Sequence, residues 1–260
     1  MSTPLEPRAR LRAEVLLVLG LSLGESAVFA VWTLVKRYLA TAPIGQQTTT
    51  LHPSATSLPI MDLIYQLLRI GFQVVPVALA LYLLSAHGVS ALRRLGLTWP
   101  RRARDASLDL GRGAVLAAAI GIPGLGLYVL GRAMGQTVRI DTSGLPDQWW
   151  KALVLILAAL SVALLEEVIA VGFLVTRLRD LAWHPASAVV ASALLRGCYH
   201  LYQGWPMALG NAVMGLVFAA YFAKKGRLAP LIAAHVLLDL VSFLGPELAP
   251  ESWLTALRLA

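Results

Sequence analysis

Residues 151–174 of the chain read KALVLILAALSVALLEEVIAVGFL. A helix needs about 20 apolar residues to cross the hydrocarbon core of a bilayer, and this stretch is apolar from Ala152 to Leu165 except for one serine. The sequence therefore predicts a membrane-spanning helix. Glu166 and Glu167 follow inside it, although a charge near the bilayer centre costs about 2.5–3.5 kcal/mol on insertion scales. Two carboxylates at this depth need partners, a hydrated cavity or a chemical role.

The rest of the chain has the same apolar character. Of its 260 residues, 58% are hydrophobic and 14% are charged, whereas about a quarter of the residues are charged in a typical soluble domain. We count about seven segments that are long enough to cross a membrane: residues 14–35, 61–85, 110–131, 149–174, 186–203, 207–223 and 228–245. The expected fold is all-α, a polytopic membrane helix bundle of about seven transmembrane helices surrounded by lipid bilayer.

The net charge of +8 does not indicate a nucleic-acid partner, because the basic residues gather in alternate loops. The clusters are Arg8, Arg10 and Arg12, then Arg93, Arg94, Arg101, Arg102 and Arg104, then Arg177 and Arg179, and finally Lys224, Lys225 and Arg227. This positive-inside pattern, which only Lys36 and Arg37 disturb, predicts a plasma-membrane protein with a cytoplasmic N-terminus. A cleaved signal peptide over residues 1–42 is the alternative, but its apolar stretch exceeds the about 7–15 residues typical of such peptides.

Few polar side chains interrupt the first two segments. They are Glu25 in the first and Gln66, Arg69 and Gln73 in the second, where the spacing puts the three side chains on one helical face. An ion pair between Glu25 and Arg69 is the expected role of these two charges, because it would tie two neighbouring helices together.

The last four segments carry a denser set of polar side chains: Glu166, Glu167, Arg196, His200, Asn211, His235 and Asp239. Arg196 and His200 are four residues apart, as are His235 and Asp239, so each pair shares one face of its helix. Three helices can therefore direct carboxylates and imidazoles at one interior point. Asn211 is expected to be structural, as a hydrogen-bonding group between helices.

This set of side chains can bind a divalent metal or polarise a water molecule. Zinc or another divalent metal would take His200, His235 and Glu166 as ligands, and whether any metal takes part stays open. Adjacent glutamates on a helix point about 100° apart, so Glu166 and Glu167 should divide the work. One would act as general base on a water, and the other would be held ionised by a cation and would orient its neighbour.

At these residues the sequence resembles the CPBP family, the CAAX prenyl endopeptidases and bacteriocin-processing enzymes of membranes. The family pattern has Glu-Glu-x-x-x-Arg on one helix, Phe-x-x-x-His on the next, and His-x-x-x-Asn or Asp on a later one. Here EEVIAV supplies Glu166 and Glu167, RGCYH supplies His200, and HVLLD supplies His235 and Asp239. Val171 stands in place of the family Arg and Arg196 in place of the Phe. We hypothesise that Arg196 replaces the missing cation by pairing with Glu167.

The resemblance implies an intramembrane endopeptidase that hydrolyses a peptide bond of a membrane-associated protein or peptide. Glu166 would activate the water, His200 and His235 would hold it, and Asp239, Glu167 and Arg196 would support them. It divides the chain into an N-terminal three-helix region (residues 1–147), a catalytic core (148–246) and a short tail (247–260). A proton- or ion-coupled transporter and a catalytically silent scaffold of the same fold remain the alternatives. The substrate, the cleavage position and the oligomeric state do not follow from the sequence.

Overall fold

The computed structural model describes residues 8–85, 90–98, 103–142, 144–250 and 252. Arg101 and Arg102 of the second basic cluster, and most of the predicted tail at 247–260, lie outside these residues.

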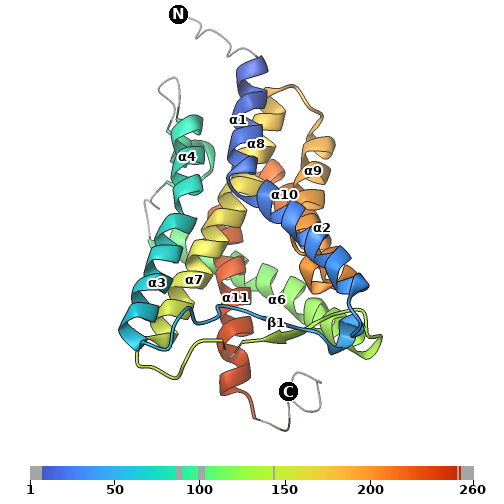
Figure 1. Ribbon diagram of the computed structural model, residues 1–260. Helices are drawn as coiled ribbons and strands as arrows, with labels where there is room; N and C mark the ends of the chain where they lie inside the picture. The colour runs from blue at the N-terminus through green and yellow to red at the C-terminus, as the bar shows by residue number, and fades with distance from the viewer. Residues whose placement is uncertain (1–7, 86–89, 99–102, 143, 251, 253–260) are drawn as a thin grey trace, which may run out of the picture.

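The described chain folds as a bundle of helices, which confirms the predicted all-α class (Figure 1). Its α-helices are α1 (Arg8–Gly20), α2 (Leu23–Leu39), α3 (Pro59–Gln73), α4 (Val75–Leu84), α5 (Ala91–Arg94), α6 (Ala103–Ala133), α7 (Lys151–Glu166), α8 (Leu174–Asp180), α9 (Pro185–Tyr199), α10 (Trp205–Lys225) and α11 (Ala229–Leu248). A π-helix, η3 (Glu167–Phe173), joins α7 to α8, and short 3-10 turns cover Ile44–Gln46 (η1) and Leu201–Gln203 (η4). Strands β1 (Thr48–Thr50) and β2 (Arg139–Asp141) form one parallel ladder, with Thr48 opposite Arg139.

Five helices of the described residues are long and apolar enough to span a membrane, and a sixth is counted if the bent pair of α1 and α2 forms one span. The predicted count of seven is therefore not confirmed. The difference lies at the predicted segment 186–203, where α9 has only 15 residues and is about 22 Å long. Its helix ends at Tyr199, and the chain turns through η4 before α10 begins. The first predicted segment is bent by 51° between α1 and α2.

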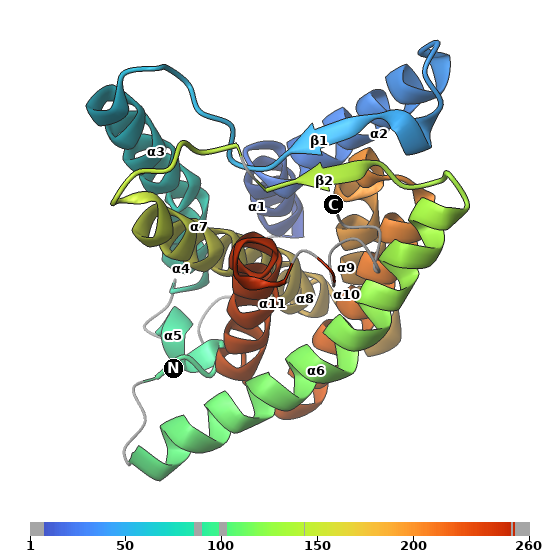
Figure 2. The same cartoon turned by 90° about the horizontal axis from the view of Figure 1, so that it is seen from below.

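The helix formed by α7, η3 and α8 is the central element of the bundle. In the most apolar part of this Lys151–Asp180 span, 67% of the residues are buried, against 11% for α6. Helices α4, α9, α10 and α11 pack around it, and α6 lies along one side of the bundle against α10 and α11 (Figure 2). Any polar side chain on η3 is consequently enclosed by protein on several sides.

The two ends of the molecule differ in charge and in structure. The start of α1, the end of α8 and the start of α9 lie at one end, and the end of α11 lies at the other (Figure 1). The predicted irregular loop 40–59 runs along that second end and contributes η1 and β1. The basic clusters that flank α1, α8 and α9 therefore share the first end.

The predicted ion pair between Glu25 and Arg69 is wrong. Both residues are exposed, and no ion pair joins them within the described chain. Gln66 instead donates to the backbone carbonyl of Pro53, at 3.1 Å, and Gln73 accepts a hydrogen bond from Ser161 at 3.3 Å. The polar side chains Gln66 and Gln73 of α3 thus bind the loop and α7 rather than α2.

Candidate active site

The two glutamates lie where the central helix changes from α to π geometry. Glu166 is the last residue of α7 and Glu167 is the first of η3. A π-turn widens the helix and displaces backbone carbonyls from their usual partners, and such turns are common at functional sites. The buried Ser192 of α9 donates its hydroxyl to the Ala170 carbonyl of η3 at 2.7 Å. This bond fastens the π-helix to α9, the helix that carries Arg196 and His200.

Glu167 is completely buried and is held by two cationic or donor groups. Its Oε1 forms an ion pair with Nη2 of Arg196 and lies 2.7 Å from Nδ1 of His235. The predicted pairing of Arg196 with Glu167 across two helices is therefore present. Oε2 of Glu167 has no hydrogen-bond partner among the described residues. Glu167 thus shares one carboxylate oxygen between a guanidinium from α9 and an imidazole from α11.

Glu166 occupies a different environment, although it is the adjacent residue. Its Oε2 accepts a hydrogen bond of 2.8 Å from the hydroxyl of Tyr199, and Arg196 Nη2 lies 3.8 Å from the same atom. Nε2 of His235 is 3.9 Å away. No described residue donates a hydrogen bond to Oε1. Glu166 therefore keeps one carboxylate oxygen available for a water molecule.

His235 connects three carboxylates. Besides its contact with Glu167, its Nε2 lies 3.6 Å from Oδ2 of Asp239, one turn further along α11. Glu166, Glu167, Arg196, His235 and Asp239 consequently form one continuous network from three helices, as the spacing predicted.

His200 joins this network less directly. Its Nδ1 lies 3.0 Å from the carbonyl oxygen of Arg196, so Nδ1 must carry the proton and Nε2 presents a lone pair. The ring also lies against Tyr199, with centroids 4.7 Å apart. No direct hydrogen bond between His200 and Glu166 is found in the described chain.

Tyr199 is the site residue that the sequence analysis missed. It is buried, and its only hydrogen bond within the described residues goes to Glu166. A signal was present, because a tyrosine inside a membrane segment needs a partner for its hydroxyl and this one directly precedes His200. Asn211, in contrast, does not bridge helices as predicted, since its amide donates to the Met207 carbonyl of its own helix at 3.0 Å.

The three predicted metal ligands are His200, His235 and Glu166. No group of three or more His, Cys, Asp or Glu side chains suited to a metal ion is found among the described residues. The Arg196 guanidinium, 3.8 Å from Glu166, would also repel a divalent cation bound at that carboxylate.

Comparison with known proteins gives one match. Residues 148–241 match a family model described as type II CAAX prenyl endopeptidase Rce1-like. The matched segment contains every residue of the predicted site, from Glu166 to Asp239. No curated protein and no solved structure matched the chain.

Proposed function

Because residues 148–241 are Rce1-like and hold the whole glutamate–histidine network, we propose that the chain is an intramembrane endopeptidase. It hydrolyses a peptide bond of a membrane-associated protein or peptide. The observation that carries the proposal is the unequal environment of the two glutamates. Glu167 is fully buried and ion-paired, whereas Glu166 shares one oxygen with Tyr199 and keeps the other available.

Glu166 acts as the general base in this proposal. Its Oε1 takes a proton from a bound water while the water oxygen attacks the carbonyl carbon of the scissile peptide. Nε2 of His200 accepts the second hydrogen of that water, because Nδ1 already donates to a backbone carbonyl. The carbon–nitrogen bond then breaks, and the proton on Glu166 passes to the leaving nitrogen. General acid–base catalysis of this kind contributes about 10²–10⁴-fold.

The other members of the network position Glu166. Tyr199 fixes Oε2, so that Oε1 faces the water. Arg196 and His235 hold Glu167 in place, and Asp239 faces His235 from one turn away on α11. This arrangement supports a hydrolysis that proceeds on the side chains of the chain itself, and no step in it passes through a metal.

A competing function is proton- or ion-coupled transport, in which the same residues would carry protons. Purified protein in liposomes discriminates between the two functions. We expect the unmutated chain to cleave members of a library of membrane-tethered peptides, and Glu166→Ala to cleave none, while ion flux is the same for both. Flux that depends on Glu166, without any cleavage, would establish the transporter instead. The metal content of both proteins is measured as well, and cleavage is assayed before and after dialysis against a chelator. Cleavage that survives the dialysis would support hydrolysis without a metal.

A further inference from the structure

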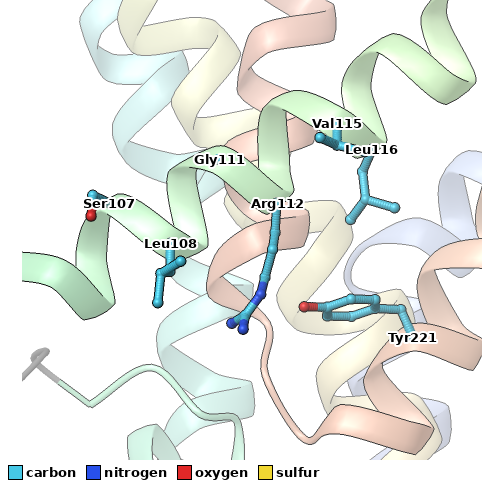
Figure 3. Close-up of a pocket in the computed structure, with 7 residues that line it drawn as sticks. All are labelled: Ser107, Leu108, Gly111, Arg112, Val115, Leu116 and Tyr221. Atoms are coloured by element: carbon cyan, nitrogen blue, oxygen red, sulfur yellow. The ribbon is translucent and has the colours of Figure 1, made fainter.

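A groove lies outside the active site, between the first half of α6 and the end of α10. It has a volume of about 430 Å³, within the roughly 300–1,000 Å³ of small-molecule sites. Leu108, Val115 and Leu116 of α6 supply its apolar wall (Figure 3). Leu108 and Val115 are exposed, which is the expected state of a surface that contacts lipid tails. We refer to this feature as the α6–α10 groove.

Among the described residues that line the groove, the polar side chains are Ser107, Arg112 and Tyr221. The hydroxyl of Ser107 already donates to the Arg104 carbonyl at 2.9 Å. The Arg112 side chain is 50% exposed and extends from α6 on the side of Tyr221, whose ring comes from α10 (Figure 3). The Tyr221 hydroxyl has no hydrogen-bond partner in the described part of the chain. A guanidinium and a free hydroxyl thus border an otherwise apolar groove.

The charge beside the groove is only partly neutralised. Arg112 Nη1 lies 3.3 Å from Oδ1 of Asp109, but Arg227 holds the same carboxylate with Nε at 3.2 Å and with a second contact from Nη2. Two guanidinium groups therefore share one carboxylate. Exposed Lys224 and Lys225 end α10 close by, and Arg104 and Asp105 start α6. Basic side chains therefore outnumber acidic ones around the groove.

We propose that the α6–α10 groove binds an anionic phospholipid. The headgroup phosphate accepts hydrogen bonds from Arg112 and Tyr221, and an acyl chain lies over Gly111 against Val115 and Leu116. Arg and phosphate form charge-assisted hydrogen bonds. A lipid with net negative charge should bind here more tightly than a zwitterionic lipid, whose headgroup cation offsets the phosphate charge. The proposal is independent of peptidase activity, because none of these residues belongs to the candidate active site.

Gly111 provides a direct test, because a side chain added there would enter the groove. A Cβ at Gly111 meets no atom within 4 Å, and the same holds for Gly124 further along α6. Gly111→Leu should therefore fill the groove without disturbing the fold, and Gly124→Leu is a matched control outside it. Arg112→Gln removes the proposed phosphate contact, and Arg104→Gln makes the same change of charge on the same helix without touching the groove.

Native mass spectrometry of the full chain, titrated with phosphatidylglycerol and phosphatidylcholine in equal amounts, counts the lipids retained. We expect the unmutated chain to prefer phosphatidylglycerol and Arg112→Gln to lower that preference about fivefold, the fold-change for one Lys or Arg at an anionic surface. Gly111→Leu should lose retained lipid, and both controls should behave as the unmutated chain.

Three results would overturn the proposal. If Arg104→Gln lowers the preference for phosphatidylglycerol as much as Arg112→Gln does, the preference comes from the general surface charge and not from the groove. If Gly111→Leu retains lipid like the unmutated chain, the bound lipid is annular only. If Gly111→Leu changes the oligomeric state and leaves lipid retention unchanged, the groove holds a second copy of the chain.

Discussion

At the scale of single residues, the carboxylates and histidines of the site followed from the sequence because charge inside an apolar segment is costly and their spacings match helical faces. The pairing of Arg196 with Glu167 followed from the absence of a cation at Val171. Tyr199 could not be assigned in the same way. Its role depends on which side of α9 faces Glu166, and that is fixed by packing against η3 rather than by the local sequence.

The exchange of the cation between helices can be tested by restoring the family pattern. Arg196→Phe should lower stability by about 3–5 kcal/mol and abolish cleavage, because it leaves Glu167 buried without its ion pair. The double variant Val171→Arg with Arg196→Phe should recover part of the stability and part of the cleavage activity, since it places a cation four residues after Glu167. Thermal unfolding in detergent and peptide cleavage measure the two effects. A double variant no better than Arg196→Phe alone would argue against the exchange.

Tyr199→Phe tests the positioning of Glu166. Removing the hydroxyl should reduce kcat about 10-fold with KM unchanged, since a hydrogen bond to a charged group contributes about 1.5–3 kcal/mol. Tyr202→Phe is the matched control, because the Tyr202 hydroxyl accepts a hydrogen bond from Gln203 rather than contacting Glu166. Equal losses of kcat in both variants would assign Tyr199 to packing alone.

At the scale of elements, the apolar segments predicted where most spans lie. They did not predict the π-helix η3 inside the central span or the early end of α9. After the two glutamates, VIAVGF continues the apolar run, so nothing local distinguishes the π-helix η3 from an α-helix. The Ala170 carbonyl of η3 accepts a hydrogen bond from the hydroxyl of Ser192, which belongs to another helix. The predicted segment 186–203 also ran past the end of α9, because Leu201 and Tyr202 in the turn after Tyr199 are apolar enough to extend it.

Ser192→Ala tests the role of η3 as the support of the site. The Ala170 carbonyl would lose its donor in a buried place, which costs about 1–3 kcal/mol. We expect a lower unfolding temperature and a reduced kcat, because Glu167 shares this helix. Ser54→Ala removes an exposed hydroxyl bond of similar length, to the Thr56 carbonyl at 2.8 Å, and should change neither quantity. If Ser192→Ala also changes neither quantity, the π-helix does not need this bond.

At the scale of the whole molecule, composition predicted the membrane bundle, since burial and lipid both select apolar residues. Composition could not predict how the loop 40–59 packs at the second end of the molecule. His52 of this loop has φ 50° and packs edge-on against Phe243 of α11, with ring centroids 4.7 Å apart. Burial, and to a lesser degree the charge of Arg69, lower the pKa of His52 to about 4.

This lowered pKa predicts how stability depends on pH. Below about pH 6.5 the unfolded chain binds a proton at His52 that the folded chain does not, so stability should fall from there down to about pH 4. The loss is on the order of 3 kcal/mol at most. His52→Asn, which tolerates the positive φ, should remove this component. Unfolding temperatures measured from pH 7 to pH 4 check it, and identical slopes for both proteins would contradict it.

The central claim is that Glu166 activates the attacking water while Glu167 only positions it. The most direct test is the single-turnover cleavage rate of a membrane-tethered peptide by Glu166→Gln, a change that keeps the shape of the side chain and removes the base. The account predicts a loss of at least about 100-fold, with folding and peptide binding retained. A cleavage rate within a few-fold of the unmutated chain would contradict it.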